Sequence, residues 1–172
     1  MKKIFNIIGF NIVWWSCVLG AVYHYPYIGP TLCLFFIFIH VKYIAINNTE
    51  LRLIIYTSIV GTLVDTSFIM TNLLHYEGGY GENILIAPLW ITSMWAGFAT
   101  CINHSMEWLK GKNFVGFILG VIFGPLAYIT GEKFNVINFN SSIELTITTL
   151  ALVWGIAIIA IYIMNDQLNN ES

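Results

Sequence analysis

Asp65 is the residue whose position most strongly predicts chemistry in this sequence. It lies near the middle of 53–74, an apolar segment long enough to cross a hydrocarbon layer as a helix. A carboxyl group at that depth is costly unless it is paired, hydrated or protonated, and no Lys or Arg is expected at the same level. Ionisable groups inside membrane helices commonly serve function. We therefore predict a proton carrier or substrate anchor, or, with equal weight, a structural hydrogen bond between helices.

The polar residues around Asp65 are predicted to share its side of the helix. At 100° per residue, Ser58, Thr62 and Asn72 project in a similar direction, together with Gly61. The segment 84–105 carries a matching polar face. Because such faces avoid lipid, we predict an interior polar site. Its candidate members are Asp65, Ser58, Thr62, Asn72, Trp90, Ser93, Thr100, Asn103 and His104.

A second group of polar residues is predicted at one end of the helices. His40 and Lys42 close the segment 27–46, and Glu107 follows 84–105, near the level of His104. Glu50 and Arg52 flank the same level. We predict an inner vestibule of His40, Lys42 and Glu107. The alternative is a set of interfacial side chains solvated by lipid headgroups.

The motifs of common enzyme and cofactor sites are missing from the sequence. There is no Gly-x-Ser-x-Gly, His-Glu-x-x-His or Walker pattern, and the three cysteines form no Cys-x-x-Cys pair. His40 could meet His104 at one end, and His24 could meet His75 at the other, as haem ligands would. Histidines are common at interfaces, so we predict no cofactor and no metal.

Glycines recur at every fourth position of the segment 114–130. Gly116, Gly120 and Gly124 would allow close approach of another helix, and we predict a packing face there. The alternative is a helix interrupted at Gly124-Pro125, with freed carbonyl groups lining a site.

The composition predicts an all-α integral membrane protein. Of 172 residues, 58% are hydrophobic and 9% are charged, whereas soluble domains carry about 25% charge. With no basic stripe, nucleic acid is excluded as a partner and the lipid bilayer is expected instead. We predict one transmembrane domain over 1–172. Its six helices are placed at about 4–23, 27–46, 53–74, 84–105, 114–130 and 144–164.

The cationic residues predict the orientation of these helices. In a six-helix topology all but one of the Lys and Arg residues fall on the side of the two termini, and Lys133 alone falls on the other. Because loops rich in Lys and Arg stay in the cytoplasm, both termini are predicted there.

Short aromatic and small-residue motifs are spread over nearly the whole chain. They are Trp15-Ser16-Cys17-Val18-Leu19-Gly20, Gly61 to Asp65, Pro88-Leu89-Trp90 with Trp95 and Phe98, Asn103-His104-Ser105 with Trp108, and Gly120 to Gly131 with Gly124-Pro125 and Tyr128. In these motifs the chain resembles a family of small bacterial inner-membrane proteins, the domain of unknown function DUF 2878. The resemblance implies a multi-pass protein of the bacterial inner (cytoplasmic) membrane and a single helical domain. It brings no established activity.

Three functions fit these features. The first is a transporter or a small-molecule or lipid-binding membrane subunit, with Asp65 in its interior and Trp90 or Trp95 as a stacking wall. The second is a membrane-embedded enzyme acting on a lipid or isoprenoid, with Asp65 and His104 among its acid–base groups. Their different predicted depths argue against a dyad, so a non-enzymatic role is favoured. The third is an accessory subunit that binds a partner membrane protein through the glycine face.

Overall fold

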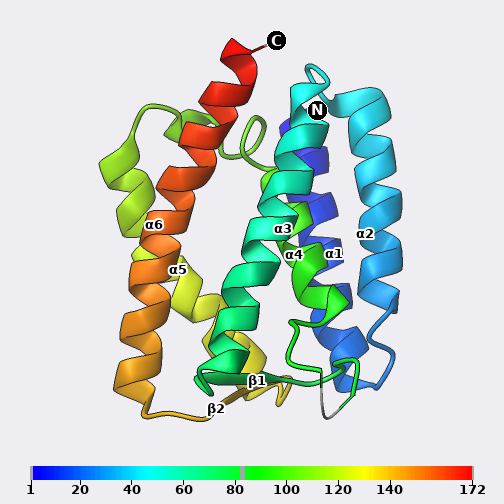
Figure 1. Ribbon diagram of the computed structural model, residues 1–172. Helices are drawn as coiled ribbons and strands as arrows, with labels where there is room; N and C mark the ends of the chain where they lie inside the picture. The colour runs from blue at the N-terminus through cyan, green and yellow to red at the C-terminus, as the bar shows by residue number, and fades with distance from the viewer. Residues whose placement is uncertain (1, 82–83, 172) are drawn as a thin grey trace.

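The computed structural model describes residues 2–81 and 84–171, which form a bundle of helices (Figure 1). The predicted helical class is confirmed, with one small sheet in addition. In chain order the elements are α1 (Lys2–Val22), α2 (Ile28–Ile39), the π-helical turn η1 (His40–Ile44), α3 (Thr49–Met70), β1 (Leu74–Tyr76), α4 (Leu89–Ala99), the 3-10 turn η2 (Glu107–Leu109), α5 (Asn113–Lys133), β2 (Ile137–Phe139) and α6 (Ile143–Asn170).

Four helices in the described part of the chain are long and apolar enough to cross a membrane. They are α1, α3, α5 and α6, while α2 and η1 together form a shorter apolar helix. Large apolar side chains such as Leu34, Phe35, Leu63 and Phe114 are exposed on the outside. A soluble protein rarely exposes so much apolar surface, and hydrocarbon would cover it. The structure is therefore compatible with a membrane protein, and the six-span topology stays a prediction.

The short helix α4 lies in the middle of the bundle. It packs against α1, α2 and α3, and one side of it is buried along its whole length. The helix covers only the central part of the predicted segment 84–105. It begins after Pro88, whose backbone is extended, and it ends where the Asn6 side chain donates to the Thr100 carbonyl. Turns follow, and residues 100–104 of this irregular stretch are mostly buried by protein.

The helices α5 and α6 pack against each other. Gly116, Gly120 and Gly124 all lie buried on the face of α5 that meets α6. A Cβ atom at Gly120 would lie 2.4 Å from the carbonyl oxygen of Trp154. The α5 helix continues through Pro125 to Lys133, so its backbone is not broken at Gly124-Pro125.

Two further boundaries differ from the predicted ones. The third helix begins at Thr49 and ends at Met70, before Asn72 adopts a left-handed conformation with φ of 56°. The last helix continues to Asn170, beyond the predicted end at 164. Its final turns are polar, and an apolar pattern detects only the part of a helix that is buried or faces hydrocarbon.

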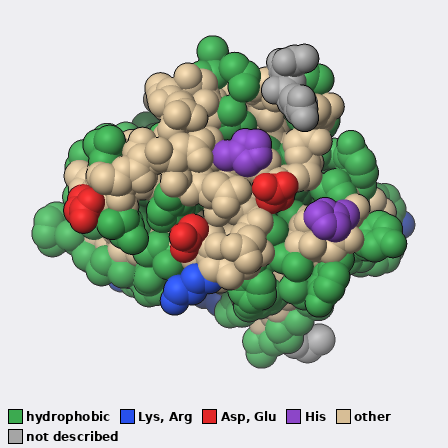
Figure 2. Space-filling view, turned by 90° about the horizontal axis from the view of Figure 1, so that it is seen from below, with side chains coloured by type: hydrophobic (Ala, Val, Ile, Leu, Met, Phe, Trp, Pro, Cys, Tyr) green, Lys and Arg blue, Asp and Glu red, His purple; other side chains and the backbone are tan. Residues whose placement is uncertain are grey.

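The strands β1 and β2 close the end of the bundle opposite the two termini (Figure 1). They are antiparallel, with Tyr76 opposite Ile137. Figure 2 shows this end, where separate acidic, basic and histidine side chains lie among tan polar and backbone atoms and hydrophobic side chains form much of the rim. The sheet joins the α3–α4 connection to the α5–α6 connection, so these two loops are held together.

Candidate functional site: a buried carboxylate beside an aromatic cavity

Asp65 is completely buried and accepts three hydrogen bonds. The hydroxyl groups of Tyr76 and Tyr128 donate to Oδ1 over 2.5 and 2.7 Å. The indole nitrogen of Trp95 donates to Oδ2 over 2.6 Å. Each bond joins Asp65 to a different element, namely β1, α5 and α4. Three donors satisfy a carboxylate without any cationic partner, and such bonds are among the stronger ones in proteins.

Local packing brings the three donors to Asp65. Gly61 lies one turn before Asp65, and a Cβ atom there would be 2.1 Å from the Trp95 ring. The missing side chain therefore allows the indole to lie directly on α3. Tyr76 reaches Asp65 because β1 turns back over the end of the bundle, where it pairs with β2. The sheet thus has a direct role in completing the carboxylate site.

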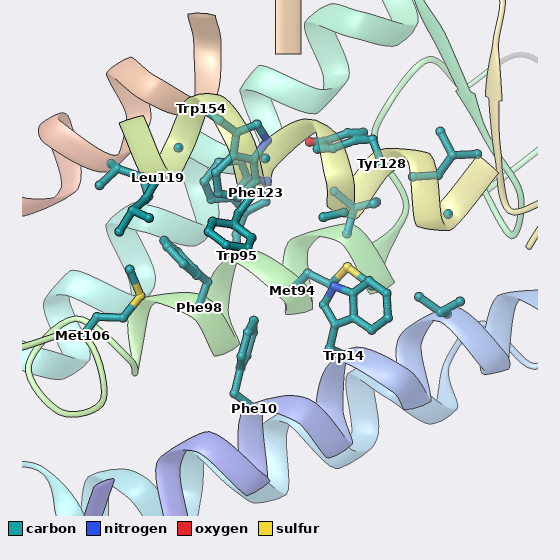
Figure 3. Close-up of a pocket in the computed structure, with 18 of the residues that line it drawn as sticks. Phe10, Trp14, Met94, Trp95, Phe98, Met106, Leu119, Phe123, Tyr128 and Trp154 are labelled. Atoms are coloured by element: carbon teal, nitrogen blue, oxygen red, sulfur yellow. The ribbon is translucent and has the colours of Figure 1, made fainter. Parts of the chain in front are cut away.

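An apolar cavity of about 340 Å³ lies beside these donors (Figure 3). It is formed by α1, α4, α5 and α6, and its walls include Phe10, Trp14, Met94, Phe98 and Phe123. In Figure 3 the aromatic rings of α1 and α4 project toward those of α5 and α6. Small-molecule sites are typically cavities of this kind, with volumes of about 300–1,000 Å³ and mostly apolar walls.

Two of the Asp65 partners also line the cavity. Trp95 and Tyr128 present their rings to it while their polar atoms bind Asp65. Trp95 is further fixed by Trp154, because the two rings stack with centroids 4.4 Å apart and planes 5° from parallel. Among the described lining residues, only Tyr128 carries a titratable group. Asp65 therefore lies outside the cavity lining and holds two of the side chains that form the wall.

The other residues of the predicted interior polar site do not gather around Asp65. Thr62 bonds Thr92, and the Ser58 and Ser93 hydroxyl groups donate to carbonyls of their own helices. Trp90 donates to the Glu77 carbonyl. Toward the termini, Thr100 binds Asn6 and Asn103 binds Asn165. Asn72 is exposed and accepts a bond from Asn140. The predicted set is therefore spread along the bundle as separate interhelical and local contacts.

The three residues of the predicted inner vestibule also lie in different surroundings. Lys42 is exposed and lies over the rings of Phe38 and Tyr43, while Glu107 is exposed and pairs with Lys3. His40 instead is fully buried. Its Nε2 atom lies 2.9 Å from Oε2 of Glu50, and Nε2 of His104 lies 2.9 Å from the same oxygen. His40 and His104 thus meet at this end of the bundle, with Glu50 between them.

A family model described as "Protein of unknown function (DUF2878)" matches residues 3–160. The chain belongs to this family. The matched range contains Asp65, its three donors, the cavity and the His40–Glu50–His104 cluster. No curated protein and no solved structure matches the chain. Membership of DUF2878 thus assigns no activity to the chain.

Tyr76 and Glu50 are the functional candidates that the sequence analysis did not single out. Tyr76 lies in a strand of only three residues within a polar connection, where no periodic pattern marks a buried side chain. Glu50 had a usable signal, because it is an acidic residue at the predicted level of His40 and His104. Its burial at the start of α3 could not be deduced from composition, since acidic residues at helix starts are usually exposed.

Proposed function

We propose that this protein is a multi-pass membrane protein that binds a lipid chain or another apolar small molecule in its aromatic cavity. It would act as a transporter or as the binding subunit of a larger membrane assembly. The observation that carries this proposal is the cavity of about 340 Å³ whose wall residues Trp95 and Tyr128 are both held by Asp65. A cavity with such fixed walls is preorganised, which lowers the entropic cost of binding.

The chemistry of the lining favours an apolar occupant. No charged side chain is among the described residues of the wall, so a charged headgroup has no partner there. The cavity is partly open, and Trp108 and Phe123 at its border are more than half exposed. In a bilayer, Phe123 would face hydrocarbon, whereas Trp108, with the Lys112 ammonium over its ring, would lie at the headgroup level. A lipid chain could therefore enter from the side, without crossing water.

The same lining makes a binding role preferable to catalysis. Acid–base catalysis needs a titratable group within hydrogen-bond reach of the substrate. The hydroxyl of Tyr128 is the candidate in the described wall, and it is already bonded to Asp65. In this proposal Asp65 is a positioning residue that does not touch the ligand.

The location we propose is the cytoplasmic membrane of a bacterium, with six spans and both termini in the cytoplasm. The arrangement of the helix ends supports this proposal. Lys133 ends α5 near the sheet, whereas Lys2, Arg52, Lys110 and Lys112 lie at the end that carries the termini (Figure 1). The excess of cations at one end is the pattern of cytoplasmic loops.

The test is photochemical cross-linking in reconstituted membranes. The probe is a phosphatidylcholine that carries a diazirine on its acyl chain. Ala127 lines the cavity and is half-buried, and its neighbour Leu126 is exposed outside the cavity. Ala127→Phe should reduce labelling of the wall peptides several-fold because it fills the space. Leu126→Phe is the matched control and should leave the labelling unchanged. Equal labelling in both variants and the wild-type protein would contradict the proposal.

A further inference from the structure

The buried cluster of His40, Glu50 and His104 lies outside the aromatic cavity and has no part in the proposed binding of lipid. The three residues come from η1, the first turn of α3 and the turns after α4. At most 4% of any of them is exposed. The two imidazole rings are nearly perpendicular, with centroids 4.9 Å apart. Both present Nε2 to a single carboxylate oxygen.

The charge of Glu50 has no Lys or Arg partner among the described residues. The cations at this end of the bundle are all engaged elsewhere: Lys2 with the Ile44 carbonyl, Lys3 with Glu107, Lys42 with Phe38 and Tyr43, Arg52 with Glu171, Lys110 with Asp166 and Lys112 with Trp108. Unlike Asp65, which accepts three hydrogen bonds, Glu50 accepts one backbone N–H bond in addition to its contacts with the two imidazoles. Removal of a charge from water costs several kcal/mol, so a cation in the cluster would stabilise this carboxylate. If both imidazoles are neutral and carry their proton on Nδ1, the two Nε2 lone pairs and Oε2 of Glu50 face one another and form an anionic pocket that a cation would fill.

The dimensions of the cluster fit a metal ion. One ligand atom from each of His40, Glu50 and His104 lies within 4.8 Å of the others. Bonds of about 2.0–2.1 Å in a tetrahedral site place ligand atoms about 3.4 Å apart. The Nε2–Oε2 separations are 2.9 Å, so a small outward movement of the rings would admit the ion.

The surroundings of the cluster hold its ligands in place. The Ile46 backbone N–H donates to Oε1 of Glu50 over 2.9 Å, which leaves Oε2 directed at the histidines. The turn that carries His104 is fixed by Asn6, which donates to Thr100 and accepts from Ser105. Such outer contacts orient the ligands of metal sites. His40 also opens a π-helical turn, a local distortion that often occurs at functional sites.

We propose that His40, Glu50 and His104 bind one divalent first-row transition-metal ion, such as Zn²⁺. Two imidazole nitrogens and one carboxylate oxygen suit these ions, whereas Mg²⁺ and Ca²⁺ prefer sites made of oxygen alone. Three protein ligands leave a fourth position for water or a small ligand. This proposal differs from the prediction from sequence, which expected no metal.

Zn²⁺ binding to the full-length protein tests the site. The protein is purified in detergent with a tag that contains no histidine, treated with a chelator, and titrated with Zn²⁺ against a chromogenic competitor. One tight site per chain is expected. His40→Gln and His104→Gln should each weaken it by at least about 100-fold. The matched control is His75→Gln, because His75 is an exposed histidine near Glu77 at the opposite end. It should bind Zn²⁺ as the wild-type protein does.

A second measurement uses the wild-type protein alone, so it tests the site even if the variants fail to fold. X-ray absorption at the zinc edge should show two imidazole ligands and one carboxylate oxygen, and millimolar Mg²⁺ should not displace the Zn²⁺. Absence of a tight site, a shell that contains sulfur or only oxygen, or undiminished binding by both folded variants would overturn the proposal. Each of these results is independent of whether the aromatic cavity binds lipid.

Discussion

The hydroxyl of Tyr76 donates a hydrogen bond to Oδ1 of Asp65 over 2.5 Å, so a strand residue satisfies a carboxylate within the helices. Tyr128 donates to the same oxygen and Trp95 to the other. The carboxylate of α3 thereby connects β1, α4 and α5. Two of these partners form walls of the cavity, so the stability of this cluster and the shape of the cavity depend on each other.

Replacing Asp65 should destabilise the bundle strongly. Asp65→Ala leaves three buried donors without an acceptor, each at a cost of about 1–3 kcal/mol. We expect a loss of about 4 kcal/mol or more, or failure to fold. Asp65→Asn keeps an oxygen for the two tyrosines but turns an amide N–H₂ group toward the Trp95 N–H. It should cost less than Asp65→Ala. Thermal unfolding in detergent measures both effects.

A double-mutant cycle separates the contact between Asp65 and Trp95 from general damage. Trp95→Phe removes the indole donor that would clash with the amide in Asp65→Asn. The double variant should therefore lose less stability than the sum of the two single variants, by about 1–2 kcal/mol. Additive losses would contradict a direct contact between these side chains.

The inward direction of Asp65 and its polar face could be predicted from the sequence. The 100° spacing of residues around a helix is a local property, so it needs no knowledge of the neighbouring helices. Trp95 was predicted as a stacking wall, and Tyr128 belongs to one of the motifs shared with the family. No sequence pattern placed either residue next to Asp65. That pairing depends on the relative rotation of three helices and on Gly61, which admits the indole. Tyr76 was hidden for another reason, since its burial depends on pairing with β2, more than sixty residues away.

Two glycines of α5 should respond differently to the same substitution. The Cβ atom of Gly120→Ala would lie 2.4 Å from the Trp154 carbonyl oxygen, so α5 and α6 would have to separate. The loss should be about 1–3 kcal/mol. Gly116→Ala is the matched control, because its Cβ atom would meet the Ile158 side chain at 3.1 Å, and a side chain can yield. Thermal unfolding should place Gly116→Ala near the wild-type protein. Equal losses would show that backbone contact is not the limiting feature.

The buried Asn6 should contribute more to stability than Asn11 of the same helix. Asn6 donates to both oxygens of Thr100 and accepts from Ser105. Asn6→Ala leaves buried polar groups unpaired and should cost about 2–4 kcal/mol. In the described part of the chain the Asn11 side chain donates just to the carbonyl one turn earlier, so Asn11→Ala should change stability by less than about 0.5 kcal/mol. If the two variants unfold at the same temperature, the turn after α4 does not depend on Asn6.

The positions of the loops lead to a labelling test of the proposed topology. Cys17, Cys33 and Cys101 are buried, with at most 3% exposed, so the wild-type protein should react little with a membrane-impermeant maleimide. Tyr80 is exposed in the connection between β1 and α4, at the sheet end of the bundle, and Lys112 is exposed just before α5, which begins at the end that carries the termini (Figure 1). In intact spheroplasts Tyr80→Cys should be labelled, and Lys112→Cys should be labelled only after the membrane is permeabilised. The reverse pattern would place the termini on the outer face of the membrane. The excess of Lys and Arg would then also lie outside, which would contradict the proposed orientation. Labelling of both positions in intact spheroplasts would contradict a bundle that crosses the membrane between them.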